Sequence, residues 1–553
     1  MARSVAEDRL AWAVLLALGA IAAVRIAAIF ATPLQLGADE AQYWRWGQDW
    51  AWGYYSKPPL IAWVIGATTS LFGDAEWAIR LPAPLLHAVA AASLFALARE
   101  MYDARVGALA ALGYMLMPGV TLSSGVMSTD GLLLPLWSLS LLALWRLRGG
   151  GGLTAAVSLG AALGLGGLAK YAMVYFILGA LLAAMIDKPT RSALMSWRGA
   201  AAAGVAAAIL APHVAWSWSN DFETLAHTAD NANWGGSLFH PENALRFFND
   251  QMGVFGPIAF LALFGAVTAF VVGVAKSAVQ ERWLLCFILP AVGIVLIQAI
   301  ISRAHANWAA VAYPAASILV PAWLLRIGGS RRDWALIAGA VFAAAFLVPM
   351  TSLFVKSLTA AGLATAIMAC GALFAWRASA LIWASLALHV AIAAAFTTLA
   401  VGPVSWSEYV GRANDFKRVR GWPETVQAIA ARANSEGVAA IVVDERENWH
   451  GLDFYGRDAL PMPIYAWRRG EAAKSHAERE NIPASDRELL MIAAAKPEFR
   501  DMMRNDFDRF DAVGTIDVPL GGGQTRRFEL FIASGFDPKP RTPAWEARFE
   551  VAP

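Results

Sequence analysis

Long apolar runs separated by short charged connections dominate this chain of 553 residues, of which 58% are hydrophobic and only 16% are charged. A run of about 20 apolar residues is long enough to cross a bilayer as a helix. The opening run, about 22 residues after Leu10, is longer than a signal-peptide core. We count about thirteen such runs; after the opening one they lie at 82–98, 106–121, 130–145, 153–169, 171–186, 199–218, 254–275, 283–301, 306–325, 334–355, 357–376 and 380–400. The pattern predicts a polytopic α-helical membrane protein.

Lysine and arginine gather in alternate connections, which is typical of the cytoplasmic side of a membrane protein. With a cytoplasmic N-terminus, an odd number of spans places residues 401–553 on the outer face. The same pattern puts the first connection, residues 33–81, and a later one, residues 219–253, outside. The basic cytoplasmic connections hold Arg99, Arg105, Arg146, Arg148, Lys188, Arg191, Arg198, Lys276, Arg282, Arg326, Arg331, Arg332 and Arg377.

The chain divides by composition into a transmembrane part, residues 1–400, and a charged C-terminal part, residues 401–553. The C-terminal part has strand candidates at 438–444 and at 528–534, the second after the turn sequence GGGQ, with a helical stretch predicted around 486–495. Strands alternating with helical patterns predict a small α/β domain. The sequence shows no catalytic motif in it, so we interpret it as a lid or docking domain on the outer face.

The first outer connection, Gly37 to Pro82, carries more chemistry than a linker needs. It holds the acidic pair Asp39 and Glu40, seven aromatic residues from Tyr43 to Tyr55, and Lys57 before two prolines. Long ordered connections usually carry function. Aromatic rings also suit the water–headgroup boundary, so an interfacial anchor with solvated charges is the alternative interpretation.

Further polar residues stand at predicted outer ends of spans: Asp130, Lys170, His227, Arg303 and His305. Each has a simpler explanation. An aspartate at a helix start is a good cap, a lysine at a span end can snorkel, and scattered histidines are usually surface residues. Arg25, inside the first run, either snorkels or faces the bundle.

Together these residues suit the transfer of a group away from a phosphate. A carboxylate can deprotonate the attacking hydroxyl, and cations can absorb the charge that develops on the departing phosphate. No nucleotide-binding fingerprint is present, so an outward-facing site is expected to use a lipid-linked donor. No internal repeat is visible, and charged residues are sparse near the middle of the spans. Repeats and midplane charges would both be expected of a secondary transporter. Cys286 and Cys370 lie in apolar runs and imply no disulfide.

The elements ADEAQYW, YYSKPPL, AIRLP and the Asp130 segment resemble the bacterial PMT-type (GT-C fold) glycosyltransferases. Within them the aminoarabinose transferase group, which modifies lipid A or related glycolipids from undecaprenyl-phosphate sugars, is the most similar. The resemblance implies a GT-C-like bundle in a bacterial inner membrane. It also implies catalytic roles for Asp39 and Asp130, with Glu40 beside them, and donor-phosphate contacts for Lys57, Lys170, Arg303 and His305. Tyr43, Tyr55 and His227 are expected to line the substrate cleft.

That group carries a metal-site glutamate where this chain has Ser56. The resemblance therefore leaves the metal, and any other cofactor, unassigned. It predicts an inverting, outward-facing glycosyltransferase that moves a sugar from a polyprenyl-phosphate donor to a glycolipid, with no nucleic-acid partner. The alternatives are a protein O-mannosyltransferase-like enzyme and a non-catalytic lipid or ion transporter.

Overall fold

The protein is described from a computed structural model that covers residues 5–234, 238–271, 278–327, 378–471, 473–483, 488–493 and 497–549. Its contacts divide the chain into two compact units. The helical unit comprises Met1–Phe30, Lys57–Ile61 and Arg80–Thr397, and the mixed unit comprises Ala31–Ser56, Ala62–Ile79 and Thr398–Pro553. The C-terminal part therefore groups with two segments of the first connection. The predicted division at residue 400 assigns these two segments to the transmembrane part instead.

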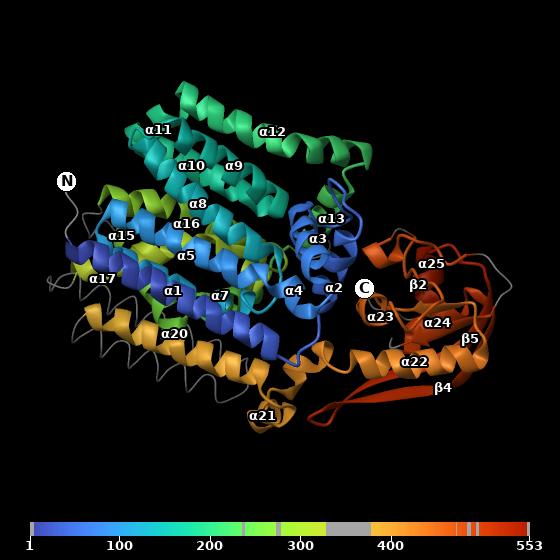
Figure 1. The fold of residues 1–553 in the computed structure, drawn as a ribbon. Helices are drawn as coiled ribbons and strands as arrows, with labels where there is room; N and C mark the ends of the chain where they lie inside the picture. Colours follow the sequence, from blue (N-terminus) through green and yellow to red (C-terminus); the bar gives the residue numbers. More distant parts are fainter. Residues whose placement is uncertain are drawn as a thin grey trace. The chain divides into compact units, whose positions relative to one another are not determined.

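The helical unit is built from apolar helices with short connections (Figure 1). Its described helices are α1 (Val5–Ala31), α5 (Pro82–Met101), α6 (Ala104–Leu116), α7 (Pro118–Ser123), α8 (Thr129–Arg148), α9 (Leu153–Ala169), η1 (Tyr171–Met173), α10 (Val174–Ile186), α11 (Lys188–Leu194), α12 (Trp197–Ser219), α13 (Glu223–Ala232), α14 (Pro241–Phe255), α15 (Pro257–Val271), α16 (Val279–Ile301), η2 (Ala306–Ala312), α17 (Tyr313–Ile327) and α20 (Ala378–Val401).

Within the described residues, seven helices are long and apolar enough to cross a membrane. The pair α14–α15, bent by 118°, makes an eighth if it counts as one span. The predicted runs 106–121, 153–169 and 171–186 appear as shorter apolar helices. The runs 334–355 and 357–376 lie outside the described residues. A polytopic helical membrane protein is confirmed, and thirteen spans remain a prediction.

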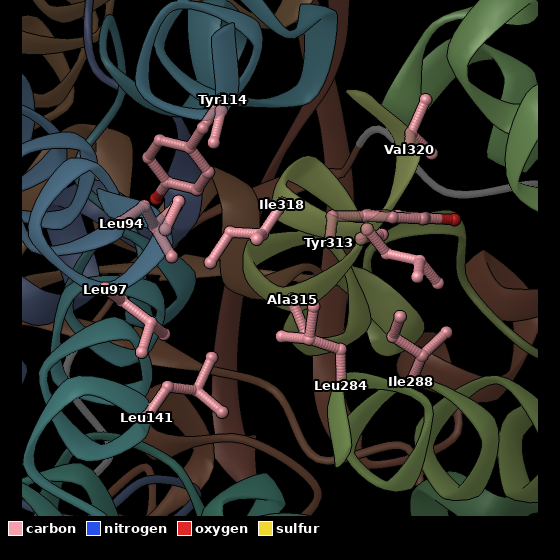
Figure 2. Packing of buried hydrophobic residues seen from close by; sticks show 14 of the residues in the cluster. Leu94, Leu97, Tyr114, Leu141, Leu284, Ile288, Tyr313, Ala315, Ile318 and Val320 are labelled. Carbon is pink, nitrogen blue, oxygen red and sulfur yellow. The ribbon is translucent and has the colours of Figure 1, made fainter. Parts of the chain in front are cut away.

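The helix α17 lies at the centre of the helical unit. In the span that contains it, 89% of the residues of the most apolar stretch are buried, against 28% for α1 and 17% for α12. Figure 2 shows Ile318 of α17 directed toward the side where Leu94 of α5 and Tyr114 of α6 lie. Ala315 in the same helix has no exposed surface, so neighbouring helices pack closely around it.

The mixed unit contains a five-stranded sheet in the order β2-β1-β3-β5-β4. The strand β1 pairs in parallel with β2 and β3, whereas β5 pairs antiparallel with β3 and β4. Its elements are α2 (Ala38–Gly47), α3 (Leu60–Phe72), α4 (Glu76–Arg80), α21 (Val404–Tyr409), η3 (Ala413–Val419), α22 (Trp422–Glu436), β1 (Ala440–Val443), α23 (Arg446–Tyr455), β2 (Ile464–Ala466), η4 (His476–Glu478), β3 (Leu489–Ala493), α24 (Pro497–Arg504), β4 (Phe507–Gly521), β5 (Gln524–Phe536), α25 (Pro543–Glu546) and η5 (Ala547–Phe549).

Both strands predicted in the C-terminal part are present, β1 within 438–444 and β5 spanning 528–534. The turn GGGQ closes the β4–β5 hairpin, with positive φ at Gly521, Gly522 and Gly523, a conformation that glycine adopts without strain. The helix predicted around 486–495 is wrong, because Leu489–Ala493 forms the strand β3 between β1 and β5. A short apolar run fits a buried helix as well as a buried strand. This run is apolar throughout because both faces of the sheet are covered at β3.

The helices α2 and α3 cross at two glycines. A Cβ atom on Gly66 would lie 2.6 Å from the carbonyl oxygen of Gly47, and one on Gly47 would lie 2.9 Å from the backbone nitrogen of Gly66. Only hydrogen at both positions permits this approach. The crossing fixes the helix that carries Asp39 and Glu40.

We expect Gly66→Ala to lower the free energy of unfolding by about 1–3 kcal/mol, because backbone atoms must move apart. The measurement is thermal unfolding of the purified protein in detergent. Gly204→Ala in α12 is the control, since its Cβ would meet no atom within 4 Å and alanine favours a helix. Equal stability of the two variants would contradict the close crossing.

Candidate active site

Asp130 lies in the first turn of α8, and both of its carboxylate oxygens are engaged. The α8 cap is Ser128, whose hydroxyl accepts the Gly131 N–H at 3.3 Å. Lys170 Nζ donates to Asp130 Oδ1 at 2.7 Å, and Asn307 Nδ2 donates to Oδ2 at 2.6 Å. The Asp130 side chain is only 10% exposed. Three segments far apart in sequence therefore meet at one buried carboxylate.

Lys170 reaches Asp130 because the chain is interrupted between α9 and η1. Lys170 adopts an extended backbone, with φ −163° and ψ 135°, and its side chain is 22% exposed. The next residue is fixed as well, since the Tyr171 hydroxyl and His213 Nε2 are hydrogen-bonded at 2.9 Å. The lysine is thus held in a charge pair and does not simply snorkel along a span.

His305 and Arg303 precede Asn307 in the segment before η2. Partial burial of His305, with the positive charges of Arg303 and Lys170, lowers the pKa of this imidazole below its ordinary value. The ring is therefore neutral at pH 7, and the groups that perturb it are cations. Such surroundings favour an anion near the ring.

The connection between α12 and α15 is fastened to this segment. Ser302 Oγ donates to the carbonyl of Asn233 at 2.7 Å, and Gln298 Nε2 donates to the carbonyl of Ala232 at 2.8 Å. Asn243 Nδ2 donates to the carbonyl of Ser302 at 2.5 Å. His227 is half-buried on α13, and its membership of the cleft stays a prediction.

A buried polar network supports the turn before Asp130. Arg25 of α1 is 8% exposed and donates to Ser124 Oγ at 2.8 Å and to the Met115 carbonyl at 2.5 Å. His87 of α5 bonds the hydroxyls of Tyr114 and Ser123 at 2.9 and 3.0 Å. Of the two alternatives for Arg25, the arginine that faces the bundle is correct.

In the mixed unit, the acidic pair divides into a buried and an exposed carboxylate. Glu40 is 2% exposed, and its Oε2 accepts the Gly37 N–H at 3.1 Å, so it caps α2. The Asp39 side chain is 64% exposed and forms an ion pair with Arg446 at the start of α23. Asp39 is therefore the carboxylate of the pair that a substrate can approach, and a catalytic role for Glu40 stays a prediction.

Most aromatic residues of the first connection form a core. Tyr43, Trp44, Trp46 and Tyr54 are at most 6% exposed. Trp46 stacks on Tyr54 at 5.0 Å, and Trp44 meets the edge of Phe454 at 4.8 Å. The expectation of interfacial rings is wrong for these four, because they pack within the mixed unit.

Three further aromatic residues of the connection have other surroundings. Trp50 and Trp52 are 59% and 48% exposed, and their position at the membrane interface stays a prediction. The Tyr55 hydroxyl donates to the Ala473 carbonyl at 2.7 Å. That bond ties Tyr55 to the C-terminal part, and its place in a substrate cleft stays a prediction, like that of Tyr43.

Lys57 is half-buried and stands directly before Pro58 and Pro59, which restrict its backbone to extended conformations. It groups with the helical unit, whereas Asp39 groups with the mixed unit. The resemblance gives Asp39, Lys57 and Asp130 roles in one reaction, and a common site for the three stays a prediction.

The described residues do not fit a metal site. Among them, no group of three or more His, Cys, Asp or Glu side chains is placed to hold an ion. Ser56, where the resembling group has a glutamate, is 7% exposed, and Gln42 Nε2 approaches its hydroxyl at 3.5 Å. An uncharged hydroxyl there is a poor ligand for a hard cation.

Sequence reasoning overlooked Asn307, which completes the bonding of Asp130. The signal was weak, because an uncharged amide after a conspicuous arginine and histidine attracts no attention. Its position two residues after His305, in a segment already expected at the outer face, was the available clue.

The chain is similar in sequence to one protein family and to two bacterial glycosyltransferases. Residues 56–216 match the protein family described as dolichyl-phosphate-mannose-protein mannosyltransferase. The lipid A galacturonosyltransferase RgtD of Rhizobium johnstonii is 38% identical over 288 residues, which are 52% of this chain and 60% of that protein. The lipopolysaccharide core galacturonosyltransferase RgtA of the same organism is 27% identical over 39% of this chain and 44% of that protein. This chain thus covers less than two thirds of either relative.

The crystal structure of ArnT from Cupriavidus metallidurans in the apo state matches 94% of this chain and 97% of that chain, with a TM-score of 0.60 and 17% identity. Its structure bound to undecaprenyl phosphate matches the same shares, with a TM-score of 0.58 and 16% identity. The chain has the ArnT fold. The resemblance to bacterial PMT-type glycosyltransferases, predicted from the first connection and the Asp130 segment, is confirmed.

We expect Lys170→Met to lower the free energy of unfolding by about 3 kcal/mol, because it leaves a nearly buried carboxylate with one donor. The double variant Asp130→Asn/Lys170→Met should lose less than the sum of the two single variants, with a coupling of about 1–3 kcal/mol. Thermal unfolding of all four proteins in one detergent measures this cycle. Additive losses would show that the 2.7 Å pair contributes nothing.

Proposed function

We propose that this protein is an integral membrane glycosyltransferase that moves a sugar from a polyprenyl-phosphate donor to a glycolipid acceptor similar to lipid A. The observation that carries the proposal is the cluster at Asp130, where Lys170 and Asn307 bind one carboxylate beside Arg303 and His305. Lysine and arginine side chains gathered beside the Asp130 carboxylate suit a phosphate that gains charge as its bond breaks.

The relatives' names guide the choice of sugar and acceptor. RgtD is named a lipid A galacturonosyltransferase, and RgtA a lipopolysaccharide core galacturonosyltransferase. We therefore propose a galacturonosyl group as the transferred sugar and a lipid A or core sugar as its acceptor. Undecaprenyl phosphate, bound in the ArnT structure, is the proposed lipid carrier.

The proposed reaction is a single displacement with inversion at the anomeric carbon. The acceptor oxygen forms a bond to that carbon while the bond to the phosphate oxygen breaks, and the electron pair leaves with the polyprenyl phosphate. Asp39 accepts the acceptor's hydroxyl proton. Lys57, Lys170, Arg303 and His305 contact the phosphate, and Asp130 orients Lys170 through their pair.

The proposed setting is the inner membrane of a bacterium. The N-terminus lies in the cytoplasm, about thirteen helices cross the bilayer, and residues 401–553 form a periplasmic α/β domain. The basic connections support this orientation. Trp50 and Trp52, exposed in the first connection, are proposed to lie at the periplasmic headgroup boundary.

The family that matches residues 56–216 favours a second candidate, a protein O-mannosyltransferase-like enzyme. The two candidates share a donor class and differ in the acceptor. The test is reconstitution of the purified protein with an undecaprenyl-phosphate sugar and either lipid A or a peptide rich in serine and threonine. Lipid A mass spectra from cells with and without the protein complete it. Transport of lipid without any glycosylated product would favour the non-catalytic alternative.

Asp39→Asn and Lys57→Ala should impair different steps. Asp39→Asn loses basicity at constant size, so we expect turnover to fall about 10²-fold or more with donor affinity retained. Lys57→Ala should weaken donor affinity and lower turnover, since attraction to the phosphate grows in the transition state. Steady-state kinetics over a range of donor concentrations separates the two. Asp49→Asn, an exposed carboxylate of the same connection, is the control, and near-normal turnover of Asp39→Asn would move the base to Glu40 or Asp130.

Donor binding should take up a proton at His305. Its pKa is lowered in the free protein, and a phosphodiester beside the ring would raise it. The uptake should therefore be largest at a pH between the lowered pKa of the free ring and the raised pKa of the bound ring, and it should vanish well above and well below both. Titration calorimetry in two buffers of different ionisation enthalpy measures it. His305→Gln should abolish the uptake and His240→Gln should keep it; uptake that persists in His305→Gln would remove His305 from the phosphate site.

A further inference from the structure

The helices α2 and α23 run side by side in the mixed unit, and ion pairs connect them at two levels. Asp39 pairs with Arg446 where both helices begin. Further along, Arg45 Nη1 lies 3.8 Å from Asp453 Oδ1. At this second level the ring of Trp44 also contacts the ring of Phe454, with their centroids 4.8 Å apart. The two helices therefore point in the same direction, away from Asp39.

A cavity of 560 Å³ opens beside the second ion pair, whose two side chains form part of its wall. Its walls include Trp44 and Arg45 of α2, Asp453 and Arg457 at the end of α23, and His476 and Arg479 around η4. This volume lies within the range of about 300–1,000 Å³ that is typical of small-molecule sites. Nothing in the proposed chemistry uses this cavity.

The charges on the wall favour an anion. Three guanidinium groups, those of Arg45, Arg457 and Arg479, face two carboxylates, those of Asp453 and Glu480. The contact between Arg45 and Asp453 is long for a hydrogen-bonded pair, and the Arg45 side chain is 48% exposed. Guanidinium groups bind carboxylates and phosphates through two parallel hydrogen bonds.

The wall also has hydrogen-bonding capacity that the described residues leave unused. Asp453 Oδ2 and His476 Nδ1 are buried and have no hydrogen-bond partner among them. Burial, with Arg479 and Arg45, lowers the pKa of His476 to about 4, so its ring is neutral at pH 7. A neutral imidazole offers one donor and one acceptor, and a carboxylate accepts, which together suit hydroxyl groups.

The remaining wall is apolar, with Leu452, Leu460 and Met462 among its residues. A ligand for this cavity needs a negative charge, hydroxyl groups and an apolar face. A pyranose ring that carries a carboxylate or phosphate has all three. We propose that the cavity binds an anionic sugar of the acceptor glycolipid, next to the sugar that receives the transferred group.

The position along α2 supports this neighbouring role. Arg45 follows Asp39 by six residues, which is about 9 Å along a helix axis. That distance is comparable with one or two sugar rings. The inference rests on the proposed function, because Asp39 marks the place of the accepting hydroxyl. The cavity would then select acceptors by their charge without contacting the reacting atoms.

The first experiment measures acceptor kinetics with the full-length protein, comparing a lipid A acceptor with its dephosphorylated form. We expect Arg45→Gln/Arg479→Ala to raise KM for the phosphorylated acceptor at least tenfold, with kcat and donor KM within about twofold of wild type. The dephosphorylated acceptor should bind wild type and variant equally. Arg418→Ala, which removes an arginine that is 74% exposed in the same unit, should resemble wild type.

The second experiment measures direct binding and does not need turnover. Titration calorimetry of the full-length protein with glucosamine 1-phosphate, galacturonate and galactose should give heat with one or both of the anionic sugars and none with galactose. The stronger anion identifies the phosphate or the carboxylate as the recognised group. Unchanged kinetics in the double variant together with no heat from either anionic sugar, or equal binding of galactose, would overturn the inference. Loss of transfer in the wild type, with anionic-sugar binding intact, would instead overturn the proposed function alone.

Discussion

The hydrogen-bonded carboxylate of Asp130 is the interaction on which the arrangement of the helical unit's polar residues depends. A carboxylate that is 10% exposed needs partners, since an unpaired buried charge is costly. Lys170 comes from the break between α9 and η1, and Asn307 from η2. Their segments are in turn fixed by Tyr171, Ser302 and Gln298, and the turn before Asp130 is supported by Arg25. One charge thus specifies the register of several otherwise interchangeable apolar helices.

The mixed unit is held together mainly by buried apolar and aromatic side chains. Its sheet buries apolar residues on both faces, and α2 with the connection after it adds an aromatic core formed by Trp44, Trp46 and Tyr54. Polar contacts complete the association: the Leu36 N–H donates to the Tyr455 hydroxyl at 2.6 Å, and the Tyr55 hydroxyl donates to the Ala473 carbonyl. A segment that follows α1 and precedes the other helices of the helical unit in sequence is therefore structurally part of the C-terminal unit.

Sequence alone predicted the membrane class, because hydropathy depends on local composition. The resemblance carried by the motifs around Asp39, Lys57 and Asp130 singled out Asp130 and Lys170, but not the contact between them. It could not predict Asn307 as a partner of Asp130, since that contact joins residues 177 apart in sequence. The burial of Trp44 could not be predicted either, because it depends on Phe454, which is 410 residues away in sequence. The strand β3 was read as a helix because five apolar residues carry no period when both faces are covered.

The 419 residues between Leu36 and Tyr455 have a consequence for biosynthesis. At about 5–20 residues per second, α2 leaves the ribosome roughly 20–80 s before α23 exists. During that interval Trp44, Trp46 and Tyr54 lack the residues that cover them. The nascent chain must shield this aromatic helix, by a chaperone or by the bilayer surface, until translation ends. The first connection then reaches its final packing only after the C-terminal residues have been synthesised, and not when the membrane helices are inserted.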